Sequence, residues 1–176
     1  GSQVGGATER SIRLSLSIIR LGPAIILLLL VLAMTLLSPV FLTGANISNV
    51  VVQTSVLAVL AIGQLFVILV AGIDLSVGSV LGLSTVTGAI VYTATSGAGG
   101  LQALLVILLT GVVCGWINGF LYVKGKMPHP FIPTLAMLYA ARGLALVISD
   151  GRPIPGMSPI VVFLGSGYIG PIPMPV

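Results

Sequence analysis

The stretch between Arg20 and Lys124 contains a single Asp, Glu, Lys or Arg side chain, that of Asp74. Around it, runs of about 20 apolar residues follow one another, and each is long enough to cross the hydrocarbon core of a bilayer as a helix. Only 6% of the residues are charged, which excludes an ordinary soluble domain. The sequence therefore predicts an all-α fold, a polytopic transmembrane bundle with about five spans. The expected spans cover residues 21–38, 50–71, 76–95, 101–123 and 131–149.

The other segments flank this membrane domain, which we place at residues 21–149. Residues 1–20 are expected to form an N-terminal tail, in which the leading Gly1 and Ser2 are consistent with an artificial addition. Residues 150–176 are rich in Gly and Pro, and closely spaced prolines prevent a long helix. We expect this segment to be an extended loop outside the membrane. The chain ends within it, which suggests the sequence is incomplete.

The Lys and Arg residues predict the orientation of the spans. They occur before the first span and at Lys124 and Lys126, whereas the connectors 43–49 and 96–100 have none. Because cytoplasmic loops are enriched in Lys and Arg, the N-terminus and the loop 124–130 are expected in the cytoplasm, with residues 150–176 on the other side of the membrane. Arg152 counts against this orientation, because it lies in the segment expected outside. The basic residues are too few and too scattered to indicate nucleic-acid binding.

The segment around Asp74 predicts a broken helix. Residues 72–79 read Gly-Ile-Asp-Leu-Ser-Val-Gly-Ser, and Gly72 and Gly78 permit an interruption of the helical hydrogen bonds. A charge at membrane depth costs about 2.5–3.5 kcal/mol, so it needs a partner or a function. Three interpretations are open for Asp74: a structural cap that accepts from the N–H of Ser76 or Val77, a direct role in transport, or an ion pair with Arg142.

Other polar side chains within the spans are candidates for a solute path. Gln53 and Gln64 lie eleven residues apart, about three helical turns, and so share one face. Such amides either line a polar path or bond to neighbouring helices, and Asn118 is open to the same two interpretations. The candidates for the solute path are Gln53, Gln64, Asp74, Ser76 and Asn118.

Small residues at intervals of four predict tight helix packing. Gly111, Gly115 and Gly119 recur in the fourth span, and Gly78 and Gly82 begin the third. A face of small residues lets a neighbouring helix approach closely. We therefore expect these glycines to lie at helix contacts.

Catalysis is not expected. The spans offer one carboxylate, whereas an intramembrane aspartyl protease needs two, and the lone His129 falls in the loop that follows the fourth span. Neither a disulfide framework nor a metal site can be built from the single Cys114. The chain lacks the glycine-rich loop that holds the phosphates of ATP, so it is not expected to hydrolyse ATP itself and no cofactor is expected on it.

Several short motifs, taken in order, resemble the permease subunits of bacterial ribose-type ABC importers. They begin with residues 72–79, and the later ones lie at 118–119, 130–135, 141–144 and 151–154. The resemblance runs from about Phe41 to Ile154, and the combination favours the sugar branch over permeases for branched-chain amino acids or nucleosides. Arg142 and Arg152 belong to these motifs, with no role assigned.

This resemblance implies an assembly of several proteins. Its expected members are two permease copies, a pair of cytoplasmic ATP-binding-cassette ATPases and an external sugar-binding protein. Such permeases are longer, and their ATPase-coupling helix lies in the second half, so the chain resembles the first half. The alternatives are the same scaffold for another solute, a structural membrane subunit, or a secondary transporter, for which one buried carboxylate is a weak basis.

Overall fold

The computed structural model describes residues 21–175, so the predicted tail 1–20 lies outside the described residues. The chain divides into two units, up to Val50 and from Val51 onward, each considered by itself. The first contains an apolar helix, Leu21–Leu37. It ends directly before Ser38 and Pro39, as predicted, because the residue before a proline disfavours helical dihedral angles.

The next helix, α2 (Gly44–Leu69), begins earlier than the predicted residue 50. The Oγ1 atom of Thr43 accepts a hydrogen bond from the N–H of Asn46 at 3.4 Å. Thr43 thus acts as the cap, since the side-chain oxygen of a capping Thr accepts from an N–H of the first turn. Asn46 and Ser48, which are also of residue types that cap helices, lie inside α2.

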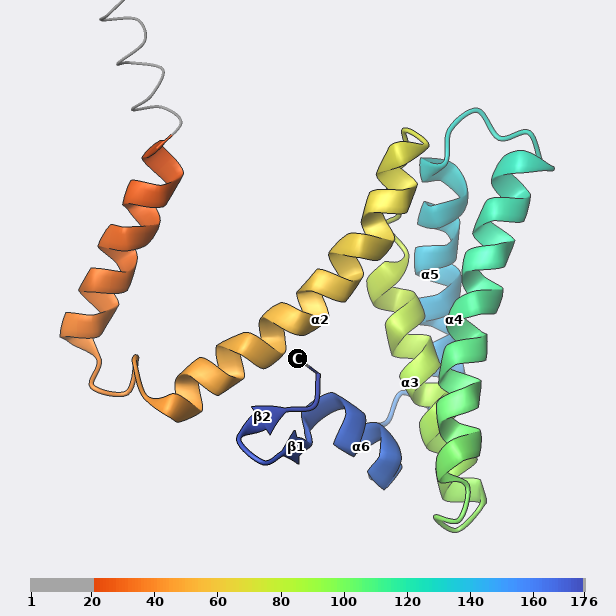
Figure 1. Cartoon of the computed structure of the whole chain (residues 1–176). Helices are drawn as coiled ribbons and strands as arrows, with labels where there is room; N and C mark the ends of the chain where they lie inside the picture. The colour runs from red at the N-terminus through yellow and green to blue at the C-terminus, as the bar shows by residue number, and fades with distance from the viewer. Residues whose placement is uncertain (1–20, 176) are drawn as a thin grey trace, which may run out of the picture. The chain divides into compact units, whose positions relative to one another are not determined.

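Three helices pack side by side in the second unit: α3 (Val77–Ala94), α4 (Gly100–Val123) and α5 (Phe131–Ile148) (Figure 1). The α3 helix makes its main contacts with α4 and α5. Leu83, Cys114 and Ala141, one from each helix, form the buried core. A hydrogen bond of 3.1 Å also joins the hydroxyl groups of Thr87 and Thr110 across α3 and α4.

Within residues 21–175, α2, α3, α4 and α5 are long and apolar enough to cross a membrane, and Leu21–Leu37 is a shorter apolar helix. Large apolar side chains are exposed along these helices, as expected of surfaces that face lipid. The predicted all-α polytopic fold is confirmed.

The close contact between helices occurs at Gly88, which the glycine pattern did not predict. A Cβ atom at Gly88 would overlap the side chain of Ile107 and lie 3.2 Å from the backbone oxygen of Ala103. By contrast, a Cβ atom on most of the predicted packing glycines would meet no atom of the described chain within 4 Å. These glycines are Gly78, Gly82, Gly115 and Gly119. Gly111 would make only an ordinary contact, 3.9 Å from the Oγ atom of Ser84.

Within the described residues these five glycines make no close helix contact, and their packing role stays a prediction. Equal spacing shows only that residues share a face, whereas a close contact also requires a second helix to cross there. Along α4, the close contact with α3 at Gly88 lies beside Ala103 and Ile107.

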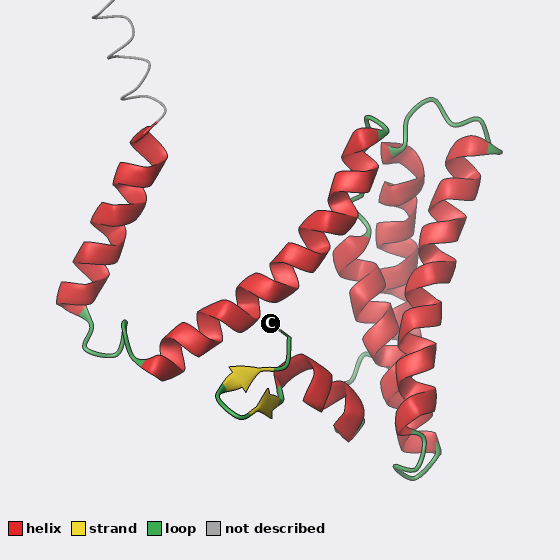
Figure 2. Cartoon of the chain, in the orientation of Figure 1, coloured by secondary structure: helices red, strands yellow, loops and turns green. Residues whose placement is uncertain are grey.

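The predicted extended loop after residue 149 is only partly correct. It contains a short helix, α6 (Pro159–Ser166), and two short antiparallel strands, β1 (Tyr168–Ile169) and β2 (Ile172–Pro173) (Figure 2). Pro159 is compatible with α6 because the first turn of a helix does not use the N–H that proline lacks. The Oγ–H of Ser158 donates to the backbone oxygen of Gly100 at 3.2 Å, which joins this segment to the start of α4.

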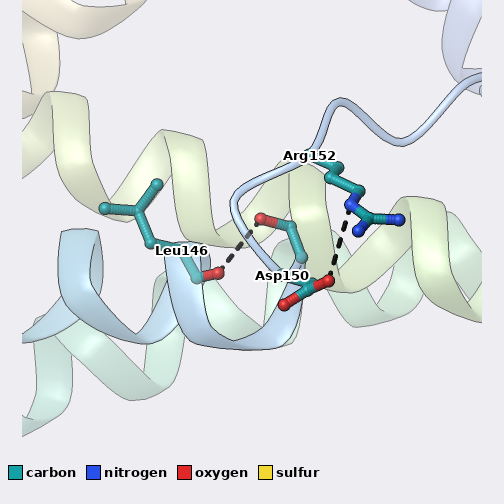
Figure 3. Close-up of polar contacts among 4 residues, drawn as sticks. Leu146, Asp150 and Arg152 are labelled. Carbon is teal, nitrogen blue, oxygen red and sulfur yellow. Dashed lines mark hydrogen bonds and ion pairs between the residues drawn. The ribbon is translucent and has the colours of Figure 1, made fainter.

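Arg152 lies just beyond α5, where its Nε atom is 3.5 Å from Oδ2 of Asp150 (Figure 3). The two side chains are 81% and 84% exposed. An exposed ion pair contributes little to stability, because water screens both charges. The motif containing Arg152 thus follows α5 without adding a buried charge.

Candidate functional site

The chain leaves the helical conformation between α2 and α3, as predicted, at residues 70–76. The N–H groups of Ala71 and Gly72 donate to the backbone oxygens of Ile68 and Val67, both at 2.9 Å. These two bonds form a Schellman motif, in which the left-handed residue is Ala71, with φ of 56°. Gly72 has a different role, since a Cβ atom there would lie 3.1 Å from the ring of Pro130.

Asp74 organises the turn that leads into α3. Its Oδ1 atom accepts hydrogen bonds from the backbone N–H of Ser76 at 2.7 Å and from the Ser76 hydroxyl at 2.6 Å. The predicted bond to the Ser76 N–H therefore forms. However, Ser76 is the residue that precedes the first turn of α3, so Asp74 closes the turn before the helix and is not its cap.

Three helices hold the broken segment in place. Gln64 of α2 donates from Nε2 to the backbone oxygen of Asp74 at 3.0 Å. Asn118 of α4 donates from Nδ2 to the Oγ atom of Ser76 at 3.0 Å, and Thr134 of α5 donates from Oγ1 to the backbone oxygen of Ile73 at 3.1 Å. Non-helical backbone at membrane depth is tolerated where protein supplies such bonds.

Thr134 was not among the predicted site residues. The signal available in the sequence was its place in the motif at 130–135, but the motif alone does not reveal which atom Thr134 contacts. The bond joins residues far apart in the chain, so only the packing of α5 beside the broken segment shows it.

The predicted ion pair between Asp74 and Arg142 does not form. Arg142 is exposed on α5 and lines a separate groove with Gly78, Ser79 and Gly82. The Asp74 carboxylate instead takes its hydrogen bonds from Ser76. The interpretation of Arg142 as the ion-pair partner of Asp74 is therefore wrong for this structure.

Two neighbouring grooves open beside the broken segment. One, of about 360 Å³, includes Asp74, Ser76 and Ser84 in its lining, and the other, of about 240 Å³, includes Asp74, Tyr122 and Thr134. Gly115 and Asn118 line both grooves. Of the predicted path residues, the structure thus brings Asp74, Ser76 and Asn118 together at a groove. Gln64 contacts their backbone from α2, whereas Gln53 is exposed and lines neither groove.

Two amide oxygens at this site are buried without a hydrogen-bond partner in the described chain, Oδ1 of Asn118 and Oε1 of Gln64. Asn118 is only 7% exposed. Buried polar atoms are nearly always hydrogen-bonded, so each exception calls for an explanation. Asn118 lines both grooves, where a bound molecule can supply the missing donor.

Known proteins resemble this chain over most of its length. Residues 46–166 match the family described as the branched-chain amino acid transport system / permease component. The ribose import permease protein RbsC of Bacillus subtilis is 44% identical over 89% of this chain and 48% of its own length. For RbsC of Haemophilus influenzae the identity is 42%, over 86% of this chain and 47% of that protein.

The D-allose transport system permease protein AlsC of Escherichia coli is also 42% identical, over 88% of this chain and 47% of its own length. The chain thus spans about half the length of the curated relatives it matches. No solved structure matches it significantly. The family match and these identities show that the chain belongs to the family of branched-chain amino acid transport system permease components.

Proposed function

We propose that this chain is part of a permease subunit that carries a monosaccharide across a bacterial inner membrane in an ATP-binding-cassette importer. The relatives named for ribose and allose support a sugar as the solute. The proposed partners are a second permease copy, a cytoplasmic ATPase and an external sugar-binding protein. The subunit itself makes no covalent bond, and ATP hydrolysis takes place on the ATPase.

The observation that carries this proposal is the broken helix at Asp74. In membrane transporters, interrupted helices lie beside the solute path, because their backbone and caps supply polar groups at membrane depth. Here the interruption is bonded to three helices and borders two grooves. Movement of the ATPases would shift these helices between two arrangements, and the site beside the break would face opposite sides of the membrane in turn.

The competing function is transport of a branched-chain amino acid, which the family description names. Uptake by the complete transporter, assembled around the full permease that contains this segment, separates the two. We expect ATP-dependent uptake of radiolabelled D-ribose or D-allose and none of L-leucine. Uptake of L-leucine without any sugar would contradict the proposed solute, and a transporter inactive with all three would leave another solute or a structural role.

The proposed orientation places the loop 124–130 in the cytoplasm and the connector 96–100 outside. Single cysteines at Lys126 and Ala98, both exposed, test it after Cys114 is replaced by Ala. In intact cells an impermeant thiol reagent should label Ala98→Cys and not Lys126→Cys. The opposite labelling would reverse the topology. Gly99 is unsuitable as the outer position, because it is buried and a side chain there would overlap Oγ1 of Thr95.

A further inference from the structure

The hydrogen bonds around Ser76 fix the orientation of the Asn118 amide. The Ser76 hydroxyl has one proton and donates it to Oδ1 of Asp74. Towards Asn118, the Ser76 oxygen is therefore only an acceptor, so the NH₂ group of the amide must face it. Rotating the amide by half a turn would set two acceptors against each other. The Asn118 Oδ1 atom is consequently the part of the side chain left without a partner.

A second acceptor lies at the same grooves. Both hydrogen bonds from Ser76 to the Asp74 carboxylate end on Oδ1. The other oxygen, Oδ2, takes no part in them, although Asp74 lines both grooves together with Asn118. The grooves are otherwise mainly apolar, so a bound molecule would meet a small set of polar groups in an apolar surround. This arrangement is typical of sites for small molecules.

The position next to Asn118 is open. Gly115 precedes it by almost one helical turn on α4 and lines both grooves, and a Cβ atom there would meet nothing within 4 Å. A molecule in either groove can therefore approach the backbone of α4 closely. The larger groove, of about 360 Å³, has the size of a site for a small molecule.

The charges of the lining determine which class of molecule fits. Neither groove has a Lys or Arg among the described residues that line it. An amino acid would leave its carboxylate without a cationic partner and near the charge of Asp74. A sugar, in contrast, is neutral and offers several hydroxyl donors to oxygen acceptors.

We propose that Asn118 Oδ1 and the Asp74 carboxylate form an acceptor pair that hydrogen-bonds the hydroxyl groups of a neutral, polyhydroxylated solute in the grooves beside Gly115. This inference rests on the proposed function, and it assigns a substrate-contacting atom to that function. Asn118 then has two separate tasks, because Nδ2 supports the broken helix while Oδ1 contacts the solute.

The first test, in the complete transporter, combines removal of the Asn118 amide from the protein with removal of single hydroxyl groups from the sugar. The probes are D-ribose and its 2-, 3- and 5-deoxy analogues, measured as competitors of radiolabelled D-ribose uptake. In the unmodified transporter at least one analogue should compete about tenfold less well, the loss expected for one hydrogen bond. In Asn118→Leu this analogue and ribose should compete nearly equally. An unchanged tenfold difference in Asn118→Leu would overturn the proposal.

The second test leaves all the hydrogen bonds intact. Gly115→Val places a side chain in the opening beside Asn118, where the described chain has room for it. Gly143→Val is the matched control, because Gly143 lies on α5, also has open space around it and lines neither groove. At equal amounts of assembled transporter, Gly115→Val should raise the KM for D-ribose at least tenfold, and Gly143→Val should leave it unchanged.

Equal KM values for the two valine variants would overturn the acceptor site even if Asn118→Leu fails to assemble. A failure of the proposed function would give a different result, because the unmodified transporter itself would then take up no sugar.

Discussion

Gly88→Leu should greatly reduce the amount of folded protein, more than any other single change considered for this chain. A Cβ atom at Gly88 already overlaps Ile107 and lies 3.2 Å from the Ala103 oxygen, which belongs to the backbone of α4. The larger leucine side chain must push α3 and α4 apart. Overpacking of this kind costs about 1–3 kcal/mol and occasionally more. The yield of monodisperse permease and its melting temperature in detergent measure the effect.

Gly143→Leu is the control for this prediction. It is the same substitution within a helix, so the gain in helix propensity is similar, about 0.8–1 kcal/mol. The leucine side chain at position 143, however, meets open space. We expect its yield and melting temperature to remain close to those of the unmodified permease. If the two leucine variants behave alike, the close contact at Gly88 does not limit stability.

The second large effect is expected at Asp74, for which charge and hydrogen bonding can be separated. Asp74→Leu removes the acceptor for both the N–H and the hydroxyl of Ser76, a residue only 1% exposed. A buried donor without a partner costs about 1–3 kcal/mol, so this variant should lose stability clearly. The same thermal melting measurement in detergent detects the loss.

Asp74→Asn distinguishes a structural from a transport role. Its side-chain oxygen can still accept from Ser76, so assembly and melting temperature should stay near normal. If the proposed acceptor pair contacts the solute, sugar uptake should fall while assembly is retained, because the amide oxygen faces Ser76 and the NH₂ group in place of Oδ2 donates and cannot accept. Normal uptake by Asp74→Asn would show that the charge is dispensable and that Asp74 only supports the turn. A stable Asp74→Leu would contradict even that structural role.

Much of the fold could be predicted from local features of the sequence. Hydrophobic length predicted the first helix, which ends directly before Ser38 and Pro39, and the residues around Asp74 predicted the interruption before α3. These features act over a few residues, through the proline ring, the membrane thickness and the cost of a charge in lipid. The sequence also supplied Asp74, Ser76 and Asn118 as candidates, because polar side chains are rare in apolar spans.

Only the tertiary structure decided which residues of different helices contact one another. The regular spacing of Gly111, Gly115 and Gly119 placed them on one face of α4, but the close contact between α3 and α4 falls at Gly88, beside Ala103 and Ile107. In the same way, the bond from Thr134 to Ile73 depends on α5 lying beside the broken segment. Sequence periodicity describes one helix at a time, whereas a contact depends on where two helices cross. That crossing is set by the packing of all the side chains between them.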